Sequence, residues 1–383
     1  MMLKKWNRLI VAILFVSYLS TGTAETPSTQ FPGLPPNFQP IKVTVLAFKI
    51  FPGSFWDLVT QFMAAAAEDL NMNLEVLDAK GYRKQMLNQA QAVVKRKNPP
   101  DYLVIANVKD IAEKMIQAAD QAGVKVFLMN TGFDAEEQKQ LGNPRQKYRY
   151  WIGQFLPDDY LAGYQAAKML IEQALRSGVT ANDGKVHLMA IAGDRTTLAS
   201  TQRLAGLKQA LAEYSKVVIH EITIYAHWEH DKAQRRILFD LTQDHHPNLN
   251  AIWAANDSMA LGAIDAVVAN HQIPGKDIFI TGMDWMPPAL QAVKAGTLLA
   301  TLGGHFMDGG WVMVLLHDYH YGKDFIQETT SFKSQLFALN ASNIDNYLNR
   351  FGQQNWQKIN FRQFSKIYSP LVKYNFSVES VIQ

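Results

Sequence analysis

Short apolar runs alternate with amphipathic stretches along the first third of the chain. The runs are rich in Val, Ile and Leu, and the stretches between them repeat apolar positions with the period of a helix. The predicted strands are 42–48, 74–79, 102–107 and 124–130, and the predicted helices are 55–70, 84–96 and 111–122. Strands separated by amphipathic helices indicate βαβ units around a buried parallel sheet.

A polar, aperiodic segment at 132–147 interrupts this alternation, which then restarts. The second series has predicted strands at 148–153, 186–192, 217–224, 251–255, 277–283 and 298–302, with helices at 158–175, 198–214, 232–242, 258–270 and 306–319. Two series of this length favour two domains of ordinary size. We therefore predict an α/β fold of two doubly wound parallel-sheet lobes joined by hinge strands.

The boundaries of these lobes follow from the interruption and from the last helix. We assign 41–153 and 305–322 to the N-terminal lobe and 154–304 to the C-terminal lobe. The hinge strands are expected near Gly153, Asp277 and Gly303, and glycine at two of these positions can absorb a change in φ and ψ.

The last part of the chain, 323–383, is polar and aperiodic but rich in aromatic residues. A disordered tail carries few aromatics. We expect this C-terminal extension to pack across the lobes or to form a docking surface.

The first residues have the features of a secretory signal peptide. Lys4, Lys5 and Arg8 precede an apolar run at 9–18, and small residues lead to Ala24, so we predict cleavage there and a polar lead segment at 25–40. The run is shorter than the ~20 residues of a membrane span, although an uncleaved anchor is the alternative. The chain has no cysteine, hence no lipid attachment site and no disulfides. These features predict a periplasmic protein that is not a lipoprotein.

Charge and motifs exclude several functional classes. Removing Lys4, Lys5 and Arg8 from the 37 basic residues leaves 34, equal to the 34 acidic residues, so a nucleic-acid partner is not expected. The usual catalytic and phosphate-binding signatures do not occur. We therefore expect a binding protein without a cofactor. An enzyme remains the alternative, in which Asp284 or Asp57 would need a second acid or base within reach.

Histidines and carboxylates gather at 227–231, with the sequence His-Trp-Glu-His-Asp. A metal site needs a defined ligand set and a supporting shell of hydrogen bonds. This segment lies between a predicted strand and a predicted helix, so solvated loop residues are the simpler interpretation. The pair at 245–246 is likewise expected in a surface turn, and no metal is predicted.

Polar and aromatic side chains follow the predicted strands at their ends. Ligands of open α/β sheets bind beyond the carboxyl ends of the strands. Asn256 follows the strand 251–255, and Asp257 or Ser258 is expected to cap the next helix. The candidate ligand-binding residues chosen in this way are Phe55, Trp56, Asn107, Asn130, Gln154, Arg203, Trp228, Asn256 and Asp284.

This mixture of residues suits a small polyol. Aromatic rings cover the C–H face of a sugar, while amide, carboxylate and guanidinium groups bind its hydroxyls. Each residue also has a structural alternative. Phe55 and Trp56 could belong to the helix core, Asp257 could serve only as a cap, and Arg195, which also follows the sixth strand, could be a loop charge.

Several segments together resemble the type I periplasmic sugar-binding proteins of ABC transporters, the group that includes ribose-binding protein. They are Gly53-Ser54-Phe55-Trp56, the strand 102–107, the helix segment 203–207, the run 255–263 and Thr281-Gly282-Met283-Asp284. The resemblance implies stacking roles for Phe55, Trp56 and Trp228. It also implies hydroxyl-binding roles for Arg203, Asn256 and Asp284, and closure of two lobes around a sugar.

The chain departs from ribose binders at two places. Asn130-Thr131 stands where they carry Asp-Arg, and Gly304-His305 stands where they carry Gln. We therefore expect a sugar or sugar-like ligand other than a simple pentose. The chain is expected to act as a monomer with an ABC permease as partner. The departures and the long extension are also similar to periplasmic receptors that report to a membrane sensor kinase, such as the autoinducer-2 receptor, and this is the alternative.

Overall fold

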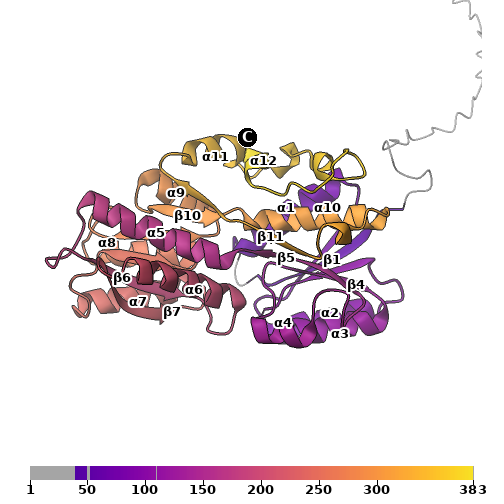
Figure 1. The fold of residues 1–383 in the computed structure, drawn as a ribbon, viewed down its shortest axis with the longest axis horizontal. Helices are drawn as coiled ribbons and strands as arrows, with labels where there is room; N and C mark the ends of the chain where they lie inside the picture. Colours follow the sequence, from indigo (N-terminus) through magenta and orange to yellow (C-terminus); the bar gives the residue numbers. More distant parts are fainter. Residues whose placement is uncertain (1–38, 50–51, 109, 383) are drawn as a thin grey trace, which may run out of the picture. The chain divides into compact units, whose positions relative to one another are not determined.

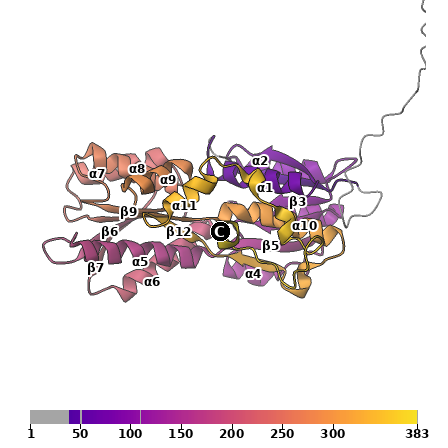
Figure 2. The ribbon, with the colours of Figure 1, turned by 90° about the horizontal axis from the view of Figure 1, so that it is seen from above.

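A computed structural model describes residues 39–49, 52–108 and 110–382 of the chain. The predicted signal peptide and nearly all of the polar lead segment lie outside these residues. From residue 39 onward the chain groups as one unit. Two six-stranded sheets, each with helices on its faces, organise it (Figures 1 and 2).

The first sheet is parallel throughout and has the strand order β11-β5-β4-β3-β1-β2. Most of its strands are buried, as the apolar runs in the sequence predict for a sheet covered on both faces. Its strands are β1 (Lys42–Ala47), β2 (Asn73–Asp78), β3 (Tyr102–Ile105), β4 (Lys125–Met129), β5 (Trp151–Pro157) and β11 (Ser331–Ser334). Its helices are α1 (Phe55–Asp69), α2 (Arg83–Val94), α3 (Ala112–Ala122), α4 (Ala135–Leu141) and α10 (Asp308–His320). We call this assembly the first lobe.

The second sheet has the order β12-β10-β9-β8-β6-β7, and only β12 runs antiparallel to its neighbour. Its strands are β6 (Val186–Ala192), β7 (Val218–Tyr225), β8 (Ala251–Ala254), β9 (Phe279–Met283), β10 (Ala300–Gly303) and β12 (Phe337–Asn340). Its helices are α5 (Asp159–Ser177), α6 (Leu198–Glu213), α7 (His230–Thr242), α8 (Asp257–Ala269) and α9 (Pro287–Ala295). We call this assembly the second lobe. The predicted fold class of two α/β lobes with largely parallel sheets is confirmed.

The segment expected to be irregular before β5 contains helix α4. The Asp134 side chain accepts hydrogen bonds from the backbone N–H groups of Glu136 and Glu137, and the Glu137 carboxylate accepts one from the Asp134 N–H. This capping box is visible in the sequence as Asp134 followed three residues later by Glu137. Helix α9 was also not predicted, although Pro287 at its first position is a common start signal.

Strand β5 lies further along the chain than predicted. It was expected at 148–153 but occupies Trp151–Pro157. The division placed between residues 153 and 154 therefore falls inside this strand, which pairs with β4 and β11 in the first sheet. The strand ends later than predicted because residues 154–157 pair with β11, which lies far along the chain.

The chain passes from one sheet to the other after β5, after β10 and between β11 and β12. Asp277 lies at none of these crossings; its carboxylate accepts a hydrogen bond from the Ile273 N–H, 2.7 Å away, in the turn before β9. Gly153 and Gly303 are close to crossings, but a Cβ would meet Phe127 in the first case and Trp285 in the second, at 2.7 and 2.5 Å. Close packing explains these glycines better than backbone freedom. The left-handed residue at the second crossing is Gly304, with φ of +95°.

The segment after residue 322 contributes one strand to each sheet, β11 and β12, and then runs over α1 and α10 (Figures 1 and 2). It also contains α11 (Ile344–Phe351) and α12 (Glu379–Ile382), with short 3₁₀ helices at Phe325–Gln327, Trp356–Lys358 and Phe361–Phe364. Its aromatic residues are buried or partly buried. Trp356 packs against Phe62 of α1, and Phe364 and Phe376 pack against Trp311 of α10, with ring centroids 4.7 to 5.5 Å apart.

Asp318 of α10 anchors this C-terminal segment. Its fully buried carboxylate accepts hydrogen bonds from the Ser365 hydroxyl at 2.5 Å, the Lys366 N–H at 2.6 Å and the Tyr374 hydroxyl at 3.0 Å. The Lys366 ammonium also pairs with Glu328. Within the described residues, none of the helices has the length and apolar character needed to cross a membrane.

Candidate functional site

A cavity of about 330 Å³ lies where the carboxyl ends of strands from both sheets meet. This is the place at which open α/β sheets bind ligands, and the volume is in the range of small-molecule pockets. All the predicted site residues except Asn107 and Gln154 line it. They are Phe55, Trp56 and Asn130 from the first lobe and Arg203, Trp228, Asn256 and Asp284 from the second.

Asn107 and Gln154 make structural contacts instead. The Asn107 amide donates to the Gly132 carbonyl at 2.9 Å, and its carbonyl oxygen accepts from the Ala112 N–H at 3.1 Å, which fixes the start of α3. Gln154 lies in the middle of β5, because that strand continues to Pro157. Its amide is 3.2 Å from the Ser331 hydroxyl of β11. Neither side chain is placed in the cavity.

The aromatic side of the cavity comes from the start of α1. Phe55 and Trp56 pack edge to face, with centroids 6.2 Å apart and planes at 74°. Phe55 stacks on the imidazole of His305 at 4.5 Å and 22°. Trp56 is nearly buried, so it contributes to the core of the first lobe as well as to the cavity.

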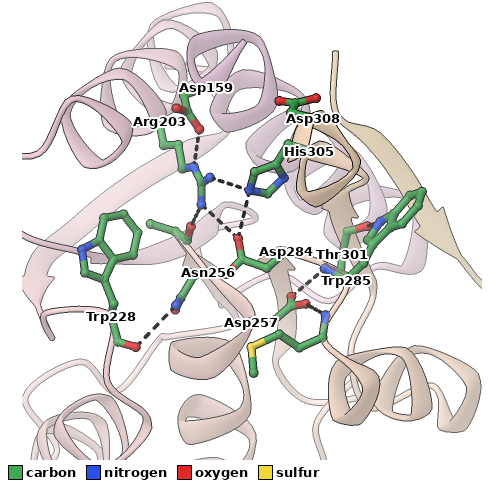
Figure 3. Close-up of polar contacts among 12 residues, drawn as sticks. Asp159, Arg203, Trp228, Asn256, Asp257, Asp284, Trp285, Thr301, His305 and Asp308 are labelled. Atoms are coloured by element: carbon green, nitrogen blue, oxygen red, sulfur yellow. Dashed lines mark hydrogen bonds and ion pairs between the residues drawn. The ribbon is translucent and has the colours of Figure 1, made fainter. Parts of the chain in front are cut away.

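Arg203 of α6 is the central charge of the site, as Figure 3 shows. Its Nε donates to Asp159 Oδ1 at 2.7 Å, and its Nη1 donates to the Ala255 carbonyl at 2.5 Å and lies 3.5 Å from Asp284 Oδ1. Burial of the guanidinium opposes its charge, but the two carboxylates outweigh burial and raise the pKa of Arg203. Arg203 is therefore a fixed cation at the base of the cavity.

Asp284 follows β9 with φ of +124°, an unusual conformation for an aspartate. Burial raises the pKa of Asp284 well above its ordinary value, Arg203 opposes this rise, and Asp257 and Asp159 add to it. Backbone strain of this kind persists only where the surrounding structure enforces it, and it is common at ligand sites.

Asn256 caps helix α8, which corrects the expectation that Asp257 or Ser258 would do so. The Asn256 Oδ1 accepts from the Met259 N–H at 2.9 Å, and its Nδ2 is 3.4 Å from the Trp228 carbonyl. Asn256 thus serves as helix cap and as cavity wall.

Asp257 points away from the cavity into the second lobe. Its carboxylate accepts from the Met286 N–H at 2.8 Å and from the Thr301 hydroxyl at 2.6 Å (Figure 3). Burial raises the pKa of Asp257 to about 7, against the opposing effect of the Thr301 and Met286 hydrogen bonds. Asp257 therefore joins α8 to the loop after β9.

Trp228 is presented by a strained turn between β7 and α7. Both His227 and Trp228 are left-handed, with φ of +55° and +67°. The indole ring lies directly against Gly193, where a Cβ would come within 2.1 Å of the ring atoms. The Arg203 guanidinium lies 5.8 Å from the ring centroid. The conformation and the glycine together fix the ring at the cavity wall.

His305 is the main residue that the sequence analysis did not select. It lies in the 3₁₀ helix His305–Met307 at the crossing after β10, and its Nε2 is 3.5 Å from both Arg203 Nη2 and Asp284 Oδ1. Burial lowers the pKa of His305 well below its ordinary value, and the charge of Arg203 adds to this. The signal for it in the sequence is that Gly304-His305 stands where ribose binders carry Gln.

The mouth of the cavity carries further charged residues that were not predicted as ligand contacts. Asp194 pairs with His227 at 2.5 Å, and Glu229 pairs with Lys232 at 2.8 Å. Arg195 instead lies over the Tyr225 ring at 3.6 Å. Among the described residues, no group of three or more His, Cys, Asp or Glu side chains is placed to hold a metal ion.

Comparison with known proteins places the chain among binding proteins. Residues 45–320 match the family described as periplasmic binding protein domain. The ribose import binding protein of Salmonella typhimurium is 26% identical over 239 residues, which cover 62% of this chain and 70% of that protein. The D-ribose/D-allose-binding protein of Pseudomonas aeruginosa is 30% identical over 205 residues, 52% of this chain and 57% of that protein.

The chain is also similar to solved structures of periplasmic binding proteins. A periplasmic sugar-binding protein from Pseudomonas fluorescens is 30% identical, with a TM-score of 0.79, and the match covers 89% of this chain and 99% of that one. A solute-binding protein of an ABC transporter from Actinobacillus succinogenes with bound D-allose is 21% identical with a TM-score of 0.67, over 81% of this chain and 100% of that one. The second likeness concerns the fold alone.

Proposed function

The chain belongs to the periplasmic binding protein domain family, and from this premise we propose that it captures a sugar or sugar-like molecule between its two lobes and presents it to an ABC permease. The role is binding without chemical conversion, and the relatives are named for binding and import. The place of action is the periplasm, where this family works.

The observation that carries the proposal is the composition of the cavity. Aromatic rings from both lobes, Phe55 and Trp228, line the same space as the polar groups of Arg203, Asn256 and Asp284. Rings of this kind cover the C–H face of a sugar, and the polar groups can each bind one or two hydroxyls.

Several polar atoms of the lining residues have no hydrogen-bond partner within the described protein. They are Ser54 Oγ, Thr131 Oγ1 and His305 Nδ1. Buried polar groups are almost always paired, so atoms of this kind next to a cavity favour a polar ligand. Since both lobes contribute to the cavity, a ligand that contacts both favours the closed arrangement by its differential affinity.

The test is calorimetry of the purified protein with D-ribose, D-allose, D-galactose and myo-inositol. We expect saturable binding of at least one of them and a loss of roughly tenfold or more in Trp228→Ala, because the stacking plane is removed. Phe239→Ala is the matched control, since Phe239 is an exposed aromatic of α7. Recovery of the sugar unchanged after long incubation is expected. Unaltered affinity in Trp228→Ala would place the binding site elsewhere.

Delivery to a permease is tested separately. The sugar-loaded protein should stimulate the ATPase of a cognate ABC permease in proteoliposomes. Stimulation of a sensor kinase instead would assign the protein to signalling.

A further inference from the structure

The charged residues of the cavity are unevenly paired. Arg203 donates its short hydrogen bond to Asp159, which lies behind it in α5, at 2.7 Å. At the mouth, Lys232 is paired with Glu229 at 2.8 Å and His227 with Asp194 at 2.5 Å. The basic side chains Arg203, His227 and Lys232 therefore each have a carboxylate within 2.8 Å.

Among the described carboxylates that line the cavity, Asp284 is the one without an ion pair shorter than 3.5 Å. Its contacts are the Arg203 guanidinium, which it shares with Asp159, and the His305 imidazole, both at 3.5 Å (Figure 3). Burial and the charge of Arg203 both lower the pKa of His305 and so disfavour its positively charged form. The Asp284 side chain is 7% exposed, so water does little to solvate it.

The surroundings of Asp284 increase its shortage of nearby positive charge. Two further buried carboxyl groups, Asp159 and Asp257, act on Asp284 and raise its pKa together with burial. A buried carboxylate is costly unless it is paired, and a partner charge at close range is the usual remedy. A ligand group beside Asp284 can supply that charge, whereas a negatively charged ligand group would add to the repulsion.

We propose that the cavity selects sugars by charge: it favours a sugar that carries a protonated amino group beside Asp284, binds the matching neutral sugar more weakly, and rejects the matching sugar acid. This inference rests on the proposed function, because it specifies the ligand of the same cavity. Asp284 sets the preference for the amine. Asp159 acts indirectly, because its ion pair with Arg203 leaves less positive charge to compensate Asp284.

Calorimetry with matched sugars tests the inference on the wild-type protein. The probes are D-glucosamine and D-galactosamine, their neutral parents D-glucose and D-galactose, and the corresponding uronic acids, at a pH where the amines are protonated. We expect at least one amino sugar to bind tenfold or more tightly than its parent, and the uronic acids to bind at least tenfold more weakly than the parents. N-acetylation of the preferred amino sugar should abolish the gain.

The variant Asp284→Asn keeps the shape of the side chain and removes the charge. It should lose the preference for the amine, so that the amino sugar and its neutral parent bind the variant with similar affinity. Glu68→Gln, the same change on the exposed end of α1, should leave all affinities unaltered. The melting temperature of each variant checks that it is folded.

The outcomes separate the two proposals. Binding of a neutral sugar with no gain for its amino counterpart, or retention of the amine preference in a folded Asp284→Asn protein, overturns the charge selection and leaves the sugar-binding function standing. Tighter binding of a uronic acid overturns it as well. If none of these sugars nor those tested above binds to the folded wild-type protein, both proposals fail.

Discussion

The Tyr374 hydroxyl donates a hydrogen bond to the buried carboxylate of Asp318, 3.0 Å away, and so ties the C-terminal segment to helix α10. The same carboxylate accepts from the Ser365 hydroxyl and the Lys366 N–H. Asp318→Ala leaves these three donors without partners, and we expect it to lower the free energy of unfolding by at least about 3 kcal/mol, because each buried donor left unpaired costs roughly 1 to 3 kcal/mol.

Denaturant unfolding measures this change, and limited proteolysis shows where the chain opens. Tyr374→Phe removes a single donor and should cost about 1 kcal/mol. Both variants should be cut faster after Gly322 than the wild type. Equal stability and equal cleavage in Asp318→Ala would mean that the aromatic packing alone holds the segment.

Gly193→Ala should weaken ligand binding without unfolding the protein. The added methyl group would come within 2.1 Å of the Trp228 ring, so the ring must move from the cavity wall. We expect at least a tenfold loss of affinity by calorimetry for whichever sugar binds. In a Trp228→Ala background the same substitution should have almost no further effect, because the clash is gone. Additive losses would show that Gly193 acts by another route.

Asn256 allows its two roles to be separated. Asn256→Asp keeps an oxygen that can accept from the Met259 N–H, so the cap on α8 survives, but it removes the amide donor near the Trp228 carbonyl. Asn256→Ala removes both and should cost about 1 kcal/mol of stability. We expect thermal unfolding to detect the loss in the alanine variant alone, whereas calorimetry should detect weaker sugar binding in both. Full affinity in a folded Asn256→Ala protein would remove this residue from the binding site.

His187 makes the stability of the second lobe depend on pH. Burial of the ring opposes protonation, but the Glu221 and Asp183 carboxylates, at 2.5 and 3.1 Å, outweigh it and raise the pKa of His187 above 6.5. The folded state therefore holds this proton more tightly than the unfolded state. The stabilisation is complete below about pH 6.5, the value of an unperturbed histidine, and is lost as the pH rises through the higher pKa of the folded state.

Urea unfolding of His187→Gln across this pH range measures the effect. The variant should be less stable than the wild type at acidic pH, and the difference should shrink as the pH rises. His271→Gln, a change of a histidine in an exposed turn, is the control. A difference that does not vary with pH would show that His187 contributes by packing rather than by charge.

The sequence was sufficient for most of the architecture because the apolar runs of a buried parallel sheet are strong local signals. Strand β6 occupies the predicted 186–192, and the starts of α1 and α6 were predicted correctly. The errors occurred where long-range packing decides. Strand β5 gains its extra residues by pairing with β11, which lies far along the chain, and no local pattern reports that partner.

The site was predictable to the extent that strand ends mark it. Arg203, Asn256 and Asp284 were selected because they follow β6, β8 and β9, and the structure brings them to one cavity. His305 escaped selection because it lies at a chain crossing, where its position depends on how β10 leads into α10. Asn107 and Gln154 have suitable side chains, but backbone groups and β11 use their hydrogen-bonding capacity.

The placement of β11 and β12 has a consequence for the order of folding. Strand β11 pairs with β5 and completes the first sheet, and β12 pairs with β10 at the edge of the second. The hydrogen bond between Gln154 and Ser331 closes a loop of 177 residues. Pairings this distant in sequence are slow to form. Until residues 331–340 have been synthesised and have docked, β5 and β10 remain edge strands with open backbone groups, so neither lobe reaches its final form before then.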